Sequence, residues 1–383
     1  MRKVLAIIAM FLLLAGCASA PGDTASDCVT YDGVVLVVGV HANQPAPNVP
    51  ADLACALRNT IAEGGAIGIV ANDGEPSVLL SATSFDVTGN NDATTRNNIT
   101  KAFNRVISTI QEAKPQKAGS DLFAALVLAA DLAHTASPAI GKVISIDAGL
   151  PDRGEVNLTV PGGTLVAADQ LAGYLTSVGA LKDDTFANLD VEFWSLARVS
   201  EPQRPLAQAQ VNNIAELWPA LALAGGAKAA TSVPMPREGD GVDTALETGL
   251  VEVIEPPEPV ASSTMTFDDT SALGFASGDS TLLDRSAARA ALVPVAEWLM
   301  AVPGRSAVIT GRTDSDHPEN NESLSTARGW TVAQLLGELG VKQEILTVVG
   351  AAYTAQPPDR LADGTLDPYA AALNRVTEIE LVG

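Results

Sequence analysis

Residues 311–328 read GRTDSDHPENNESLSTAR and place an acidic and a basic side chain around one connection between a strand and a helix. The apolar run before this stretch predicts a strand over 307–311, and the spacing after it predicts a helix over 321–339. Asp314 therefore follows the strand, and Arg328 lies two turns into the helix. A carboxylate, a helix N-terminus and a guanidinium at one edge of a sheet can bind a small zwitterion, because they attract its ammonium and carboxylate groups.

This stretch resembles the peptidoglycan-binding loop of OmpA-like domains, whose pattern is approximately GHTD…N..LS..RA. Further similar segments occur in the same order at 266–282 (TFDDTSALGFASGDSTL), 346–350 and 374–375. The resemblance implies a βαβαββ domain over 263–383 that binds the diaminopimelate of the peptidoglycan stem peptide. It also implies site residues: Asp314 for the amino group, Arg328 for the carboxylate, and Thr313, Asn321 and Arg375 to shape the pocket or contact the ligand.

Three departures from the family pattern affect the expected affinity. Arg312 stands where the family has a His, the loop 315–320 lacks the common Gly, and Val376 replaces one of two arginines. An alternative to ligand binding is that Asp314 and Arg328 pair with each other and stabilise the loop, which for an exposed pair contributes about 0–1 kcal/mol.

The beginning of the chain has the pattern of a bacterial lipoprotein signal. Arg2 and Lys3 precede an uncharged run over 4–14, which is too short to span a bilayer, and Leu-Ala-Gly-Cys follows at 14–17. This lipobox-like sequence predicts a signal peptide over 1–16, lipid on Cys17, and a small polar tether over 17–30. The alternative is an ordinary secretory signal with a chance cysteine. No Asp follows Cys17, which favours the outer membrane facing the periplasm in a diderm, and otherwise the outer face of the cell membrane.

The amino-acid composition limits the classes of ligand that the protein can bind and the states that its cysteines can adopt. A formal charge of −22 over 383 residues argues against nucleic acid as a ligand. In an oxidising compartment Cys28 and Cys55 most simply form a disulfide, and two buried free thiols are the alternative. The histidines lack metal-ligand spacing, so the sequence predicts no cofactor.

Residues 31–230 alternate between buried-strand runs and amphipathic helices, which predicts a doubly wound, mainly parallel α/β sheet. The segment 77–85 follows a strand so closely that it should pair antiparallel. The expected strands are 34–40, 66–70, 77–85, 142–146 and 189–196, and the expected helices are 52–62, 94–112, 122–134, 166–178 and 203–223.

The order of these elements resembles a von Willebrand factor type A domain. The resemblance lies in VVLVVGV at 34–40, AGSDLFAAL at 118–126 and KVISIDAGLPD at 142–152. In that family these places supply a metal-ion adhesion site. Here they supply a degenerate set around Asn43, Ser120 and Asp147, with too few oxygen ligands for a divalent cation. The sequence therefore predicts no bound metal, and a protein partner that the sequence does not identify.

The segment 231–262 is rich in proline and acidic residues. Both features extend a chain, so the segment is expected to be a stiff linker reaching on the order of 100 Å if fully extended. That reach is an upper bound, because the apolar run 251–254 offers the alternative of docking as a short strand.

These patterns together predict a cell-envelope lipoprotein, not an enzyme, that binds peptidoglycan and tethers the membrane to the wall. The alternative is an adhesion or sensing protein whose N-terminal domain binds a protein ligand, with the C-terminal domain only localising it. A hydrolase using His41 and Asp147 is a third option, but no GxSxG, GxxxxGK[ST] or GxGxxG motif accompanies them.

Overall fold

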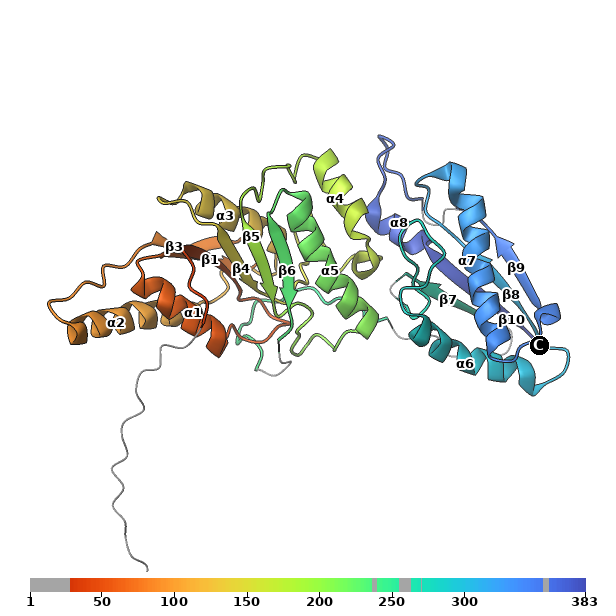
Figure 1. The fold of residues 1–383 in the computed structure, drawn as a ribbon. Helices are drawn as coiled ribbons and strands as arrows, with labels where there is room; N and C mark the ends of the chain where they lie inside the picture. Colours follow the sequence, from red (N-terminus) through yellow and green to blue (C-terminus); the bar gives the residue numbers. More distant parts are fainter. Residues whose placement is uncertain (1–27, 236–239, 255–262, 270, 354–357) are drawn as a thin grey trace, which may run out of the picture.

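The computed structural model describes residues 28–235, 240–254, 263–269, 271–353 and 358–383. They form two α/β domains, an N-terminal one with helices α1 to α5 and a C-terminal one with α6 to α8 (Figure 1). The predicted signal peptide over 1–16, the lipidation site Cys17 and most of the tether lie outside the described residues. Within the described part of the chain, no helix is both long enough and apolar enough to cross a bilayer.

The N-terminal sheet has six strands in the order β3-β2-β1-β4-β5-β6. All neighbours pair in parallel except β2 and β3, which are antiparallel. The antiparallel pairing follows from the short turn between these two strands, as the sequence predicts. The strands are β1 (Gly33–Gly39), β2 (Ala66–Asn72), β3 (Ser77–Thr83), β4 (Lys142–Ile146), β5 (Asp190–Trp194) and β6 (Ala229–Val233).

Helices cover both faces of this sheet. Successive residues of a strand point to opposite faces, and every side chain of β1 is buried, so both faces are shielded from solvent. Val35 and Val37 pack with α3, α4 and α5, whereas Val34 and Leu36 pack with α1 and α2. The predicted doubly wound α/β class is confirmed. The helices are α1 (Ala51–Ala62), α2 (Asp92–Gln111), α3 (Leu122–Thr135), α4 (Ala168–Ser177) and α5 (Gln208–Ala224), with a 3₁₀ turn at Gly163–Leu165.

A disulfide joins Cys28 to Cys55 on α1, with the two Cα atoms 6.1 Å apart. Of the two alternatives that the composition leaves open, the structure contains the paired one. The bond fixes the chain before β1 to the helix that covers one face of the sheet.

The C-terminal domain has a four-stranded sheet in the order β7-β10-β8-β9. Strand β10 is antiparallel to β7 and β8, and β8 and β9 are parallel. One apolar cluster fills the space between this sheet and the long helices α6 and α7. The elements are β7 (Thr264–Asp268), α6 (Arg285–Ala301), β8 (Ser306–Gly311), α7 (Pro318–Glu338), β9 (Leu346–Gly350), α8 (Pro368–Asn374) and β10 (Val376–Val382), with a 3₁₀ turn at Gln343–Ile345.

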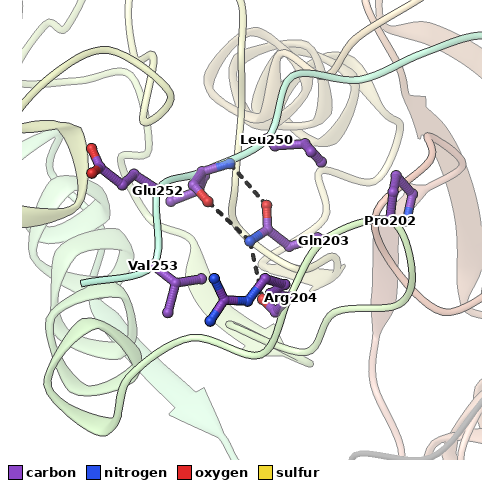
Figure 2. A pocket seen from close by; sticks show the side chains of 7 residues that line it. Pro202, Gln203, Arg204, Leu250, Glu252 and Val253 are labelled. Carbon is purple, nitrogen blue, oxygen red and sulfur yellow. Dashed lines mark hydrogen bonds between the residues drawn. The ribbon is translucent and has the colours of Figure 1, made fainter. Parts of the chain in front are cut away.

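Residues 240–254, which we call the strap, lie against the N-terminal domain instead of extending away from it. The backbone NH of Val251 donates to the side-chain oxygen Oε1 of Gln203 at 2.8 Å, and the backbone carbonyl of Val251 accepts from Gln203 Nε2 at 3.0 Å (Figure 2). The Val251 side chain is buried in the core of that domain. The extended linker expected over 231–262 is therefore wrong for these residues, because specific amide contacts and apolar burial outweigh the mutual repulsion of the acidic side chains in this proline-free stretch. Residues 236–239 and 255–262 lie outside the described residues.

Candidate functional site

A pocket of about 710 Å³ lies between the two domains. The C-terminal domain lines it with Asp314, Arg328 and Arg375, and the N-terminal domain lines it with residues of α4 and α5. The predicted site residues Thr313 and Asn321 also line it. The structure thus brings together all five residues that the sequence predicts for this site.

The backbone around Asp314 is fixed on both sides. Asn321 Nδ2 donates to the Asp314 carbonyl at 2.8 Å, and the backbone NH of Ser315 donates to Asp359 Oδ2 at 2.7 Å. Thr313 is held by its backbone NH, which donates to the carbonyl of Ala352 at 2.9 Å. Asn321 therefore shapes the loop that presents the carboxylate and is not aimed at a ligand itself.

Asp314 forms its ion pair with Arg375, in contrast to the pair with Arg328 considered above. Arg375 Nη1 lies 3.0 Å from Asp314 Oδ2, and Arg375 Nε lies 2.7 Å from Asp269 Oδ2. Burial alone would lower the pKa of the Arg375 guanidinium, but the carboxylates of Asp269 and Asp314 raise it above its ordinary value. Arg375 is therefore a charged group held between two carboxylates.

Arg328 lies on α7 and lines the same pocket. Its Nε donates to the carbonyl of Asp279 at 3.0 Å, and its guanidinium carbon lies 5.1 Å from the centre of the Phe275 ring. Burial lowers the pKa of Arg328, and the nearby Asp269 opposes that shift. The ring and the carbonyl orient the guanidinium from behind, which leaves it suited to bind an anionic group in the pocket.

Helix α7 begins earlier than the sequence predicts. Its first residue is Pro318, and His317 before it has a left-handed backbone with φ 49°. Proline is favoured in the first turn of a helix, which explains the earlier start. Asn321 and Arg328 are consequently both inside the helix.

Gln170 is a site residue that the sequence analysis missed. It lies on α4 of the N-terminal domain, and its Nε2 donates to Asp314 Oδ2 at 2.7 Å. Its Oε1 accepts from Arg375 Nη1. A glutamine in a helix carries no sequence signal for such a role, because the contact depends on how the two domains pack.

The arrangement defines a pocket whose chemistry suits a zwitterion: one carboxylate for an ammonium, and two guanidinium groups for a carboxylate. Residues 274–364 match the model of the OmpA family, and this part of the chain is an OmpA-like domain. The comparison with curated proteins finds no match to the sequence.

Solved structures with a similar domain include the periplasmic domain of MotB, at 13% identity and a TM-score of 0.25, covering 31% of this chain and 62% of that one. The peptidoglycan-associated lipoprotein from Burkholderia pseudomallei is 26% identical, with a TM-score of 0.23 over 28% of this chain and 85% of that one. The cell wall anchor of the T6SS from Pseudomonas aeruginosa is 26% identical, with a TM-score of 0.26, and the match covers 33% of this chain and 85% of that one.

The other predicted site lies at the carboxyl ends of β1, β2 and β4 in the N-terminal domain. Asp147 Oδ2 lies 3.1 Å from His41 Nε2 and accepts from Asn72 Nδ2 at 2.8 Å. Asn72 Nδ2 also donates to Ser120 Oγ at 3.0 Å. Asn43 is held elsewhere, since its Nδ2 donates to the strap carbonyl of Gly249 at 2.7 Å. Ser120 and Asp147 therefore meet at Asn72, whereas the side chain of Asn43 binds the strap.

The surroundings of His41 at this edge of the sheet favour its protonated form. Its Nδ1 lies 2.7 Å from the carbonyl of Ala42 and its Nε2 faces Asp147, so both ring nitrogens meet acceptors. Burial alone would lower the pKa of His41, but the Asp147 carboxylate raises it above its ordinary value. Among the described residues, no group of three or more His, Cys, Asp or Glu side chains could hold a metal.

Proposed function

We propose that this protein is a cell-envelope lipoprotein that binds peptidoglycan non-covalently through the diaminopimelate of the stem peptide and so tethers a membrane to the wall. The observation that carries the proposal is the meeting of Asp314, Arg328 and Arg375 in one pocket of the OmpA-like domain. Diaminopimelate presents an ammonium beside a carboxylate, which the pocket's carboxylate and guanidinium groups match in charge. No step of this function requires the protein to make or break a bond, and we propose no enzymatic activity.

The wall-binding part of the proposal predicts a large effect of two substitutions. Asp314→Ala and Arg328→Ala in the full chain should each weaken binding to diaminopimelate-type peptidoglycan by roughly tenfold or more, because a hydrogen bond to a charged group is worth about 1.5–3 kcal/mol. Co-sedimentation with purified sacculi measures the bound fraction.

Exposed residues of the same charge provide matched controls for this experiment. Asp363→Ala and Arg289→Ala remove exposed side chains and should pellet like the wild-type protein. Circular dichroism establishes that each variant is folded. Two results would show that the pocket does not bind the wall. In the first, neither the wild-type protein nor a Gln170→Ala variant, which frees Asp314 from its contact with Gln170, pellets with the sacculi. In the second, the folded Asp314 and Arg328 variants pellet as well as the wild-type protein does.

The lipoprotein part of the proposal rests on the sequence at 14–17, which lies outside the described residues. Lipid on Cys17 should make the full chain partition into the detergent phase of Triton X-114 and incorporate a clickable palmitate analogue in bacteria. Cys17→Ser should lose both properties, whereas Cys28→Ser should retain them. A wild-type chain that takes up no label would favour the secretory-signal alternative.

Location follows from the same proposal. A lipid at Cys17 and a wall-binding domain would put the protein in the cell envelope, in the outer membrane facing the periplasm if the source is diderm, and otherwise on the outer face of the cell membrane. The N-terminal domain, which we propose is von Willebrand A-like, would then be displayed between membrane and wall for a protein partner. Support for that likeness is the six-stranded sheet with its antiparallel β3 at one edge.

A further inference from the structure

The side chain of Gln170 forms hydrogen bonds with the charged groups of the OmpA-like pocket. Its amide nitrogen donates to Asp314 Oδ2, and its amide oxygen accepts from Arg375 Nη1. The pocket therefore receives a donor on its carboxylate and an acceptor on its guanidinium from a single group. A zwitterionic ligand would offer the same pair, with its ammonium as the donor and its carboxylate as the acceptor.

The pocket groups are nearly closed to solvent in this arrangement. Asp314 and Arg375 are each 7% exposed, and Arg328 is 3% exposed. Peptidoglycan is a polymer whose stem peptides must reach these groups from outside. A ligand amino group cannot use Asp314 Oδ2 fully while both Gln170 and Arg375 hold that oxygen.

Other contacts hold the two domains in this closed arrangement. The backbone NH of Asn157 donates to the hydroxyl of Tyr369 on α8 at 3.1 Å, and Arg375 Nη2 donates to the carbonyl of Leu165 at 3.3 Å. Burial between the domains raises the pKa of Tyr369 to about 12. Tyr369 also packs against the apolar core of the N-terminal domain, so the interface combines polar contacts with limited apolar burial. Interfaces between domains of one chain are by default expected to allow relative motion unless they are large and hydrophobic.

We propose that Gln170 is an internal occupant of the zwitterion site, so that the N-terminal domain controls access of the wall ligand to Asp314 and Arg375. This inference rests on the proposed peptidoglycan binding and adds its regulation. Ligand binding then requires the withdrawal of α4 from the pocket. The apparent affinity is the intrinsic affinity multiplied by the fraction of molecules that are open.

The test compares binding of a soluble, diaminopimelate-containing muropeptide to full-length variants by calorimetry. Gln170→Ala removes the occupant and should bind roughly tenfold tighter than wild type, within the range of about 5–150-fold for coupling between sites. Tyr369→Ala loosens the interface away from the pocket and should also tighten binding. Gln208→Ala removes a glutamine of α5 whose side chain donates to Asn212, and it should bind like wild type.

A second measurement follows the domains themselves. Small-angle X-ray scattering should show a larger radius of gyration for the wild-type protein at saturating muropeptide, and Gln170→Ala should show part of that increase without ligand. Binding with no change in the radius of gyration would overturn the inference.

The outcomes separate this inference from the proposed function. If the wild-type protein binds the muropeptide and Gln170→Ala binds it more weakly, Gln170 is part of the ligand site. If Gln170→Ala binds the muropeptide as tightly as the wild-type protein does, Gln170 does not compete with the ligand. Either result overturns the inference and leaves peptidoglycan binding intact. If wild type, Gln170→Ala and Tyr369→Ala all fail to bind, the proposed function is wrong and the inference fails with it. Adding Asp314→Ala to Gln170→Ala should abolish the gain.

Discussion

Asp147→Ala is expected to lower the free energy of unfolding of the N-terminal domain by about 3–5 kcal/mol, because it leaves the buried His41 without its ionic partner. Asp147 is 1% exposed and His41 is 2% exposed, so water cannot replace the lost contact. The same substitution also leaves Asn72 Nδ2 without one acceptor and the backbone NH of Gly149 without its partner at 2.7 Å. Urea unfolding followed by circular dichroism measures the loss.

A matched control is Asp183→Ala, which removes an exposed carboxylate from the same domain and should change stability by less than about 0.5 kcal/mol. The pH dependence gives a second readout. The raised pKa of His41 means that its contribution is fully present below about pH 6.5 and is lost as pH rises through the folded-state pKa. The lowered pKa of Asp147 means that its contribution is lost as pH falls through a value below the ordinary one of 3.8.

The free energy of unfolding of the wild-type protein should therefore fall as pH rises from 6.5 to the folded-state pKa of His41. The His41→Gln variant should not show this fall in the same pH range. An Asp147→Ala variant that unfolds at the same urea concentration as Asp183→Ala would contradict the account of a buried ion pair.

Loss of the Cys28–Cys55 disulfide is expected to destabilise the same domain by about 3–4 kcal/mol in the chain-entropy model for a loop of this length. The double substitution Cys28→Ser and Cys55→Ser removes the cross-link and leaves Cys17 intact. Chemical denaturation under oxidising conditions should show the difference from wild type.

Reductant provides the control for this second prediction. Dithiothreitol should lower wild type to the stability of the double variant and should leave the double variant unchanged. Equal stability of the oxidised wild type and the double variant would mean that the bond adds nothing to the fold, contrary to the expectation.

The central elements of both domains could be predicted from the sequence because burial on both faces produces continuous apolar runs. Strand β1 and helix α3 are such elements, and their observed bounds differ from the expected ones by one residue at most. Strand β6 was missed, since AATSV at the sheet edge is only partly buried and carries no apolar run. Helix α8 was missed because it is a single short element that begins after the cap Asp367.

The strap and the closed pocket depend on contacts between distant segments, which no local pattern encodes. Composition describes 240–254 as an extended chain, yet Gln203 binds its backbone from about 48 positions away. In the C-terminal site the family motif located Asp314, Arg328 and Arg375, but it did not indicate that Asp314 pairs with Arg375. Arg312, which stands where the family has a His, forms an ion pair with Glu378 at 2.9 Å, and the motif did not indicate this contact either.

The position of β10 has a consequence for the order in which the molecule is made. Residues 376–382 form the strand that joins β7 to β8, so the C-terminal sheet stays incomplete until this segment has left the ribosome. All six strands of the N-terminal sheet are made before residue 234, and domains generally fold in order of synthesis. Helix α4 with Gln170 is then in place before the pocket exists, and the pocket assembles against it.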